Sequence, residues 1–132
     1  MSEPTILFVC LHGAAKSVIA ASHCQRLADD AGVSIHATFA GTEPDPEIAP
    51  AAAAGLLAEG IDVREQPTRR VTAEELRNAW RVISFGCDLE GLAPGVRVER
   101  WDDVPAVSEN YRLARDVIVA RLPGLVEAVQ PA

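Results

Sequence analysis

The sequence predicts an α/β fold: one doubly wound domain over residues 1–132, with a four-stranded parallel sheet and helices on both faces. Short apolar runs rich in β-branched residues show no polar alternation, which is typical of strands covered on both sides. Between these runs lie stretches with apolar residues at helical spacing, separated by turns that contain Gly and Pro. A chain of 132 residues is long enough to bury such a core without disulfides.

Each element follows from its residues, in chain order. Thr5-Ile6-Leu7-Phe8-Val9 is a continuous apolar run and is expected to form a central strand. The further expected strands cover 34–40, 81–85 and 96–100, the last at the sheet edge. The expected helices cover 17–31, ending at Gly32; an Ala-rich stretch 46–59; a short helix after the capping box Thr72-Ala73-Glu74-Glu75; and 110–129, which Pro123 should bend or break.

Composition excludes several classes of partner. The formal net charge of −7 argues against duplex nucleic acid and anionic membranes, because both are bound by a net basic face. The three cysteines, Cys10, Cys24 and Cys87, form no CxxC pair, so neither a disulfide framework nor a zinc site of standard spacing is indicated. We expect no bound metal and no cofactor. Reduced thiols and the lack of a run of ~20 apolar residues predict a cytoplasmic protein.

The segment CLHGAAKS, residues 10–17, joins the first strand to the first helix. Ligands of doubly wound sheets bind beyond the carboxyl ends of the strands, where Cys10 stands. The loop amides and the positive end of the helix favour an oxyanion, and together with Lys16 and a cationic His12 they favour the Cys10 thiolate. Ser17 can donate a hydrogen bond to this sulfur, and Gly13 can take a positive φ. The segment therefore indicates a nucleophile in an anion-binding loop, the alternative being a buried core thiol.

The stretch ILFVCLHGAAKS-VIA resembles the opening of the low-molecular-weight protein tyrosine phosphatases and the related thioredoxin-coupled arsenate reductases. Their loop reads Cys, five residues, Arg, then Ser or Thr. The likeness continues through AGTEPDPEIAP, GLLAEGIDV, RVISFGCDLEGL and VERWDDVPA, in order, over nearly the whole chain. The resemblance implies a flavodoxin-like strand order and an oxyanion-binding loop made of Leu11, His12, Gly13, Ala14, Ala15 and Lys16.

The resemblance also implies roles for single residues. Cys10 matches the nucleophile, and Ser17 matches the residue that tunes the thiolate. Lys16 stands where the family has an Arg that clamps the oxyanion with a planar, two-pronged guanidinium. Loss of one such donor costs roughly 3 kcal/mol of transition-state stabilisation, or about a hundredfold in rate.

The general acid of the family is an Asp immediately before a Pro, whereas this chain has Asp102-Asp103-Val104-Pro105. Asp103 is the candidate and Asp102 the reserve, against the alternative that both lie in a solvated acidic loop. Glu43 and Asp45, in the Pro-rich loop after the second strand, are expected to be solvated, the alternative being that they face the pocket.

Redox chemistry in the arsenate reductases passes through further cysteines, the first in a Cys-Gly-Asp segment. Here the corresponding residues are Gly86-Cys87-Asp88, and no third cysteine follows in that turn. Cys87 is therefore a possible redox partner of Cys10, whereas Cys24 on the first helix is expected to be a buried structural thiol.

Three functional hypotheses follow. The leading one is cysteine-dependent hydrolysis of a phosphomonoester by Cys10, Lys16, Ser17 and Asp103, which makes the protein a phosphatase. The second is arsenate reduction in which a low-molecular-weight thiol, or Cys87, resolves the adduct on Cys10. The third is a catalytically weak anion-binding or regulatory module. All three take a small oxyanion or a phosphorylated substrate.

Overall fold

The computed structural model describes residues 3–129, in which four strands form one sheet with the order β2-β1-β3-β4. The strands are β1 (Thr5–Cys10), β2 (His36–Gly41), β3 (Arg81–Ser84) and β4 (Glu99–Arg100). All neighbouring strands run parallel. The predicted four-stranded parallel sheet and its flavodoxin-like strand order are confirmed.

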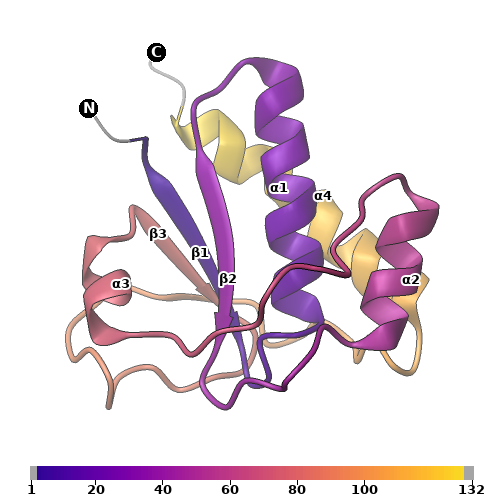
Figure 1. Cartoon of the computed structure of the whole chain (residues 1–132). Helices are drawn as coiled ribbons and strands as arrows, with labels where there is room; N and C mark the ends of the chain where they lie inside the picture. The colour runs from indigo at the N-terminus through magenta and orange to yellow at the C-terminus, as the bar shows by residue number, and fades with distance from the viewer. Residues whose placement is uncertain (1–2, 130–132) are drawn as a thin grey trace.

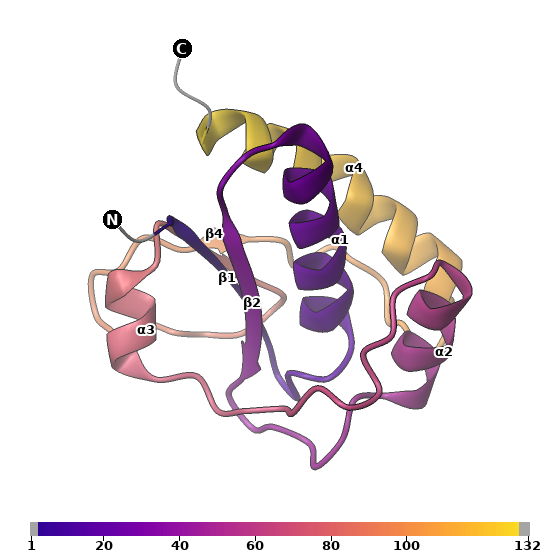
Figure 2. The ribbon, with the colours of Figure 1, turned by 45° about the horizontal axis from the view of Figure 1, so that its top comes forward.

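Helices cover both faces of the sheet. They are α1 (Lys16–Ala31), α2 (Pro50–Ala58), α3 (Ala73–Asn78) and α4 (Tyr111–Val129). Figure 1 shows α1 and α4 together on one side, with α2 beside them, and Figure 2 shows α3 on the opposite side of the strands. The predicted doubly wound arrangement is thus confirmed.

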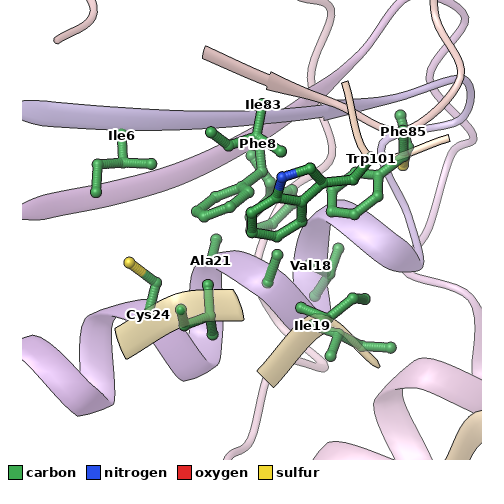
Figure 3. Packing of buried hydrophobic residues seen from close by; sticks show 14 of the residues in the cluster. Ile6, Phe8, Val18, Ile19, Ala21, Cys24, Ile83, Phe85 and Trp101 are labelled. Carbon is green, nitrogen blue, oxygen red and sulfur yellow. The ribbon is translucent and has the colours of Figure 1, made fainter. Parts of the chain in front are cut away.

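The strand β1 is buried on both faces, as its unbroken apolar run predicts. Ile6, Phe8 and Cys10 belong to the hydrophobic cluster between the sheet and helices α1, α2 and α4. Leu7 and Val9 point the other way, into a second cluster with α3. Figure 3 shows the larger cluster, in which side chains of the sheet face those of α1. Because β1 lies between β2 and β3, its carboxyl end is central and holds Cys10 in a fixed position.

Helix α2 begins at Pro50, four residues later than the sequence pattern indicates. The preceding segment is not helical, because its amides donate hydrogen bonds to carbonyls of the loop after β1. These bonds run from Glu43 to Leu11, from Asp45 to His12 and from Ala49 to Ala14. The segment 42–49 is therefore held extended beside that loop, and Pro50 starts the helix at a position where Pro is favoured.

The other helix boundaries follow the sequence closely. The capping box is present, with the Thr72 hydroxyl accepting from the Glu75 amide and the Glu75 carboxylate accepting from the Thr72 amide. Helix α4 continues through Pro123, so the expected break does not occur; the exposed proline only leaves the carbonyl of Val119, one turn earlier, without its helical donor. Within residues 3–129, no helix combines the length and apolar character that crossing a membrane requires.

Candidate active site

Cys10 is the last residue of β1, and only 7% of its surface is exposed. Its Sγ lies 3.0 Å from the hydroxyl oxygen of Ser17, in the first turn of α1, and Ser17 is fully buried. When the sulfur is a thiolate, the hydroxyl donates to it, and a charge-assisted hydrogen bond of this kind is a strong one. The structure thus brings together the two residues that the sequence placed seven positions apart.

The loop between these residues leaves its amide groups available to an anion. No side chain caps the start of α1 at Ala15, and the first turn carries no acidic residue. The positive end of the helix therefore has no carboxylate of its own to neutralise it. Gly13 has φ +57°, as expected, which lets the loop curl around the sulfur.

A cavity of about 440 Å³ opens beside this loop. Cys10 and Lys16 lie in its wall, so the nucleophile and the cation that the sequence predicted share one space. The remaining lining is contributed by the loop, by the segment before and at the start of α2, and by residues after β3 and β4: Leu11, His12, Ala14, Ala15, Asp45, Ala49, Pro50, Ala51, Phe85, Ala106, Val107 and Ser108. A separate cavity of about 320 Å³ between β2 and α3 has no cysteine or lysine in its lining.

A close backbone contact with the end of β2 holds the loop in position. A Cβ atom placed on Gly13 would lie 2.6 Å from the amide nitrogen of Gly41, and one on Gly41 would lie 2.5 Å from the amide nitrogen of Gly13. No side chain fits at either position. The two glycines therefore let the segment 42–49 run directly against the loop after β1.

Asp45 lines the cavity while 47% of its side chain stays exposed, so it faces the pocket and is also partly solvated. Its Oδ1 lies 3.2 Å from Nδ1 of His12, which also approaches the Glu43 carbonyl at 3.3 Å. The sequence predicted His12 as a loop residue and missed Asp45 as its partner. The two prolines around Asp45 indicate a turn, but nothing local indicates that the turn meets residue 12.

Asp102 and Asp103 are both exposed, and neither belongs to the lining of the cavity. Asp103 is paired with Arg121 through contacts of 2.9 Å and 2.6 Å, and hydrogen bonds from this guanidinium lower the pKa of its carboxyl group. Asp102 accepts from the Gly86 amide and from Arg100, each at 2.9 Å. Asp103 stays a prediction for the general acid, but its pairing favours the ionised form, which has no proton to give.

Cys24 and Cys87 have different surroundings. Cys24, a residue of α1, is fully buried in the cluster between that helix and the sheet (Figure 3). Burial raises the pKa of its thiol to about 11, which fits the predicted structural role. Cys87 follows β3, the strand next to β1, and the pKa of its thiol is raised first by burial and then by the charge of Cys10. The two thiols are therefore close enough for their charges to interact. Among residues 3–129, no three His, Cys, Asp or Glu side chains gather to hold a metal ion.

The far wall of the cavity depends on how α2 is anchored. Glu59, which follows α2, accepts hydrogen bonds from Tyr111 and Arg115 of α4, and His23 of α1 lies 3.3 Å from it. Burial alone would raise the pKa of the Glu59 carboxyl group, but these hydrogen bonds outweigh it and hold the pKa below its ordinary value. Burial lowers the pKa of His23. This cluster ties α2, and with it Pro50 and its neighbours, to two other helices.

The chain is similar to known proteins in sequence. The model of the family described as "Low molecular weight phosphotyrosine protein phosphatase" matches residues 5–98. A protein of Halobacterium salinarum named "Putative arsenate reductase" is 29% identical over 130 residues, which cover 94% of this chain and 92% of that protein.

Solved structures of similar fold span nearly the whole chain. YfkJ from Bacillus subtilis has a TM-score of 0.83 at 21% identity, over 98% of this chain and 96% of that one. The thioredoxin-dependent arsenate reductase Cg_ArsC1' of Corynebacterium glutamicum has a TM-score of 0.77 at 26% identity, over 98% of this chain and 63% of that one. The chain therefore shares its fold with both of these proteins.

Proposed function

The chain belongs to the low molecular weight phosphotyrosine protein phosphatase family, and from this premise we propose that it hydrolyses phosphomonoesters with Cys10 as the nucleophile. The observation that carries the proposal is the 3.0 Å contact between the Cys10 sulfur and the buried Ser17 hydroxyl, at the uncapped start of α1. A hydroxyl and a helix end directed at one sulfur favour its thiolate form. The sulfur also lines a cavity large enough for an aryl phosphate.

The reaction consists of two displacements at phosphorus. In the first, the Cys10 sulfur forms a bond to phosphorus while the bond to the ester oxygen breaks, and the leaving oxygen takes up a proton. In the second, water attacks phosphorus, the bond to sulfur breaks, and inorganic phosphate leaves. The loop amides and Lys16 hold the non-bridging oxygens through both steps.

Lys16 sets the expected rate. An ammonium is a compact point charge, whereas a guanidinium holds two oxygens in one plane. The loop amides must then supply the second contact. Anion binding is therefore expected to be retained better than turnover.

The cavity also favours a class of substrate. Its wall opposite the loop is formed by small apolar side chains, with Phe85 as the one aromatic residue in the lining. An aryl or alkyl group can lie against this wall, but no pair of aromatic rings is present in it to clasp a phosphotyrosine. We therefore propose a small phosphomonoester rather than a substrate restricted to phosphotyrosine.

The test is hydrolysis of 4-nitrophenyl phosphate between about pH 5 and pH 8, with wild type beside Cys10→Ser. The variant should lose turnover and still bind inorganic phosphate in a calorimeter. Cys24→Ala is the matched control, because that thiol is buried outside the cavity, and it should keep the activity if it folds. Turnover that survives in Cys10→Ser would contradict the proposal. Phosphate binding without turnover in wild type would favour the anion-binding module.

Arsenate reduction is the second candidate, favoured by the similarity to the Halobacterium protein and by Cys87, a thiol after the neighbouring strand β3 whose pKa is raised by burial and by the charge of Cys10. The Cys10 sulfur would displace hydroxide from arsenate, which leaves protonated as water. A second thiol would then attack that sulfur, form a disulfide and leave the electron pair on arsenic as arsenite. Arsenite release that requires added low-molecular-weight thiol would identify the external route, whereas loss of release in Cys87→Ser would identify the internal one. Both need reduced thiols, which fits the proposed cytoplasmic location.

A further inference from the structure

We propose that His12 and Asp45 form the acid–base pair of this site, with His12 as the group that protonates the leaving oxygen and Asp45 as its positioning residue. The inference rests on the proposed phosphomonoesterase function. It assigns the proton that this reaction needs to a pair of residues inside the cavity, instead of to the acidic loop after β4.

The first argument is position. Four titratable side chains lie in the cavity wall: Cys10, His12, Lys16 and Asp45. Cys10 is the nucleophile and Lys16 the anion-binding cation, which leaves His12 and Asp45 for proton transfer. The segments that face them across the cavity, from α2 and from the loops after β3 and β4, contribute only Ala, Pro, Phe, Val and Ser to the lining.

The second argument is the tautomer of His12. Its Nδ1 lies 3.2 Å from an Asp45 carboxylate oxygen and 3.3 Å from the Glu43 carbonyl oxygen. Both neighbours can only accept, so Nδ1 carries a hydrogen. The proton exchanged in the reaction must therefore be the one on Nε2. Within residues 3–129, this nitrogen has no hydrogen-bond partner. A histidine whose Nδ1 donates to the Glu43 carbonyl and lies against the Asp45 carboxylate, with Nε2 free, is arranged for general acid–base catalysis.

The third argument is rigidity. The backbone of this pair is held on both sides, since the Asp45 amide donates to the His12 carbonyl at 3.0 Å and the Thr68 hydroxyl donates to the Asp45 carbonyl. The side chains themselves are half exposed, 56% for His12 and 47% for Asp45, so protons exchange with water freely. The geometry is thus fixed while the titrating nitrogen remains accessible.

The proton balance closes over the two displacements. In the first, Nε2–H of the imidazolium gives its proton to the ester oxygen as the bond to phosphorus breaks. In the second, the neutral Nε2 takes a proton from the water that attacks phosphorus. The imidazolium is restored when phosphate leaves, and Asp45 stabilises it throughout by its negative charge.

The experiment compares kcat/KM for two esters. The leaving group of 4-nitrophenyl phosphate departs readily as an anion, whereas that of phenyl phosphate needs a proton. His12→Gln should lose about a hundredfold on phenyl phosphate and less than about threefold on 4-nitrophenyl phosphate. His36→Gln, at the start of β2 and outside this cavity, is the matched control and should behave as wild type. Asp45→Asn should lower kcat on phenyl phosphate and leave KM and the rate on 4-nitrophenyl phosphate unchanged, because His12 loses the neighbour that orients its ring.

Equal losses on both esters, or no loss, would overturn the role of His12 while leaving the phosphatase proposal intact. A selective loss in Asp103→Asn with His12→Gln unaffected would also overturn it, and would restore the acidic loop as the proton source. No Cys10-dependent release from either ester would overturn the phosphatase proposal and this inference together. Thermal unfolding of each variant separates these outcomes from misfolding.

Discussion

The contact between Gly13 and Gly41 is the most demanding feature of the site and gives the sharpest test of its geometry. Substitution of Gly13 by alanine introduces two separate problems. The residue has φ +57°, and the new Cβ would lie 2.6 Å from the Gly41 amide nitrogen. The chain offers a control for each problem. Gly32 has φ +70° with nothing within 4 Å of a Cβ, whereas Gly41 has the close contact without a positive φ.

The magnitudes follow from these two terms. An alanine at positive φ costs about 1–2 kcal/mol. A methyl group forced into a packed contact costs about 1–3 kcal/mol. Alanine also lowers the conformational entropy of the unfolded chain relative to glycine, which offsets about 0.4–1 kcal/mol of either loss. The free energy of unfolding should therefore fall by about 1 kcal/mol for Gly32→Ala, about 1–2 kcal/mol for Gly41→Ala and about 3 kcal/mol for Gly13→Ala.

Urea unfolding measures these differences, with the slope checked for each variant. Binding of inorganic phosphate provides a second measurement on the same proteins. Gly13→Ala and Gly41→Ala should weaken it, because relief of the contact moves the loop amides, whereas Gly32→Ala should leave it unchanged. The reasoning is refuted if Gly41→Ala is as stable as wild type and binds phosphate equally well, since the contact would then not determine the loop.

Three further predictions concern charge and reactivity. Lys16→Arg should raise kcat for 4-nitrophenyl phosphate by up to about a hundredfold, because a guanidinium holds two oxygens of the transferred group; a lower kcat would contradict the clamp role. The free energy of unfolding, measured in urea, should fall as the pH drops below 6.5, because His23 has a lower pKa in the folded chain and so binds its proton first in the unfolded chain. It should fall again below about 4.5, as the pH approaches the lowered pKa of Glu59 in the folded chain. Glu59→Gln should make the second fall smaller but not remove it, because Asp103 also has a lowered pKa, and a second fall of unchanged size would contradict the assignment. Iodoacetamide at neutral pH should alkylate Cys10 and spare Cys24, whose thiol has a pKa of about 11, and peptide mass spectrometry that finds equal labelling would contradict this.

The sequence predicted those parts of the fold that depend on local patterns. The unbroken apolar run of β1 and the helical spacing of α1 each report their own burial, so both elements lie within a residue or so of the expected bounds. The capping box at Thr72 is equally local. The start of α2 was placed too early, because alanine-rich residues favour a helix while the amides of 42–49 are taken by the loop after β1.

In the candidate site, too, the sequence predicts what depends on local spacing and misses what depends on long-range packing. Cys10, Lys16 and Ser17 lie within one strand–loop–helix unit, so their spacing alone brings them together. Asp45 reaches the cavity only because a segment more than thirty residues later in the chain lies against the loop. The pairing of Asp103 with Arg121 spans 18 positions and joins a loop to α4. Such pairings depend on how elements pack, which periodicity and spacing do not describe.

The segment 42–49 therefore has two functions that cannot be separated. Its junction with β2 supplies Gly41, whose backbone lies against the loop after β1, and its interior supplies Asp45, the carboxylate 3.2 Å from the His12 ring. A shift of this segment would move the oxyanion amides and the proposed acid together. If Lys16 holds the anion as proposed, it offers one charged contact, and the site then depends more on these backbone positions than a site with a two-pronged guanidinium would. The close approach of two glycines is thus a requirement of the chemistry as well as of the packing.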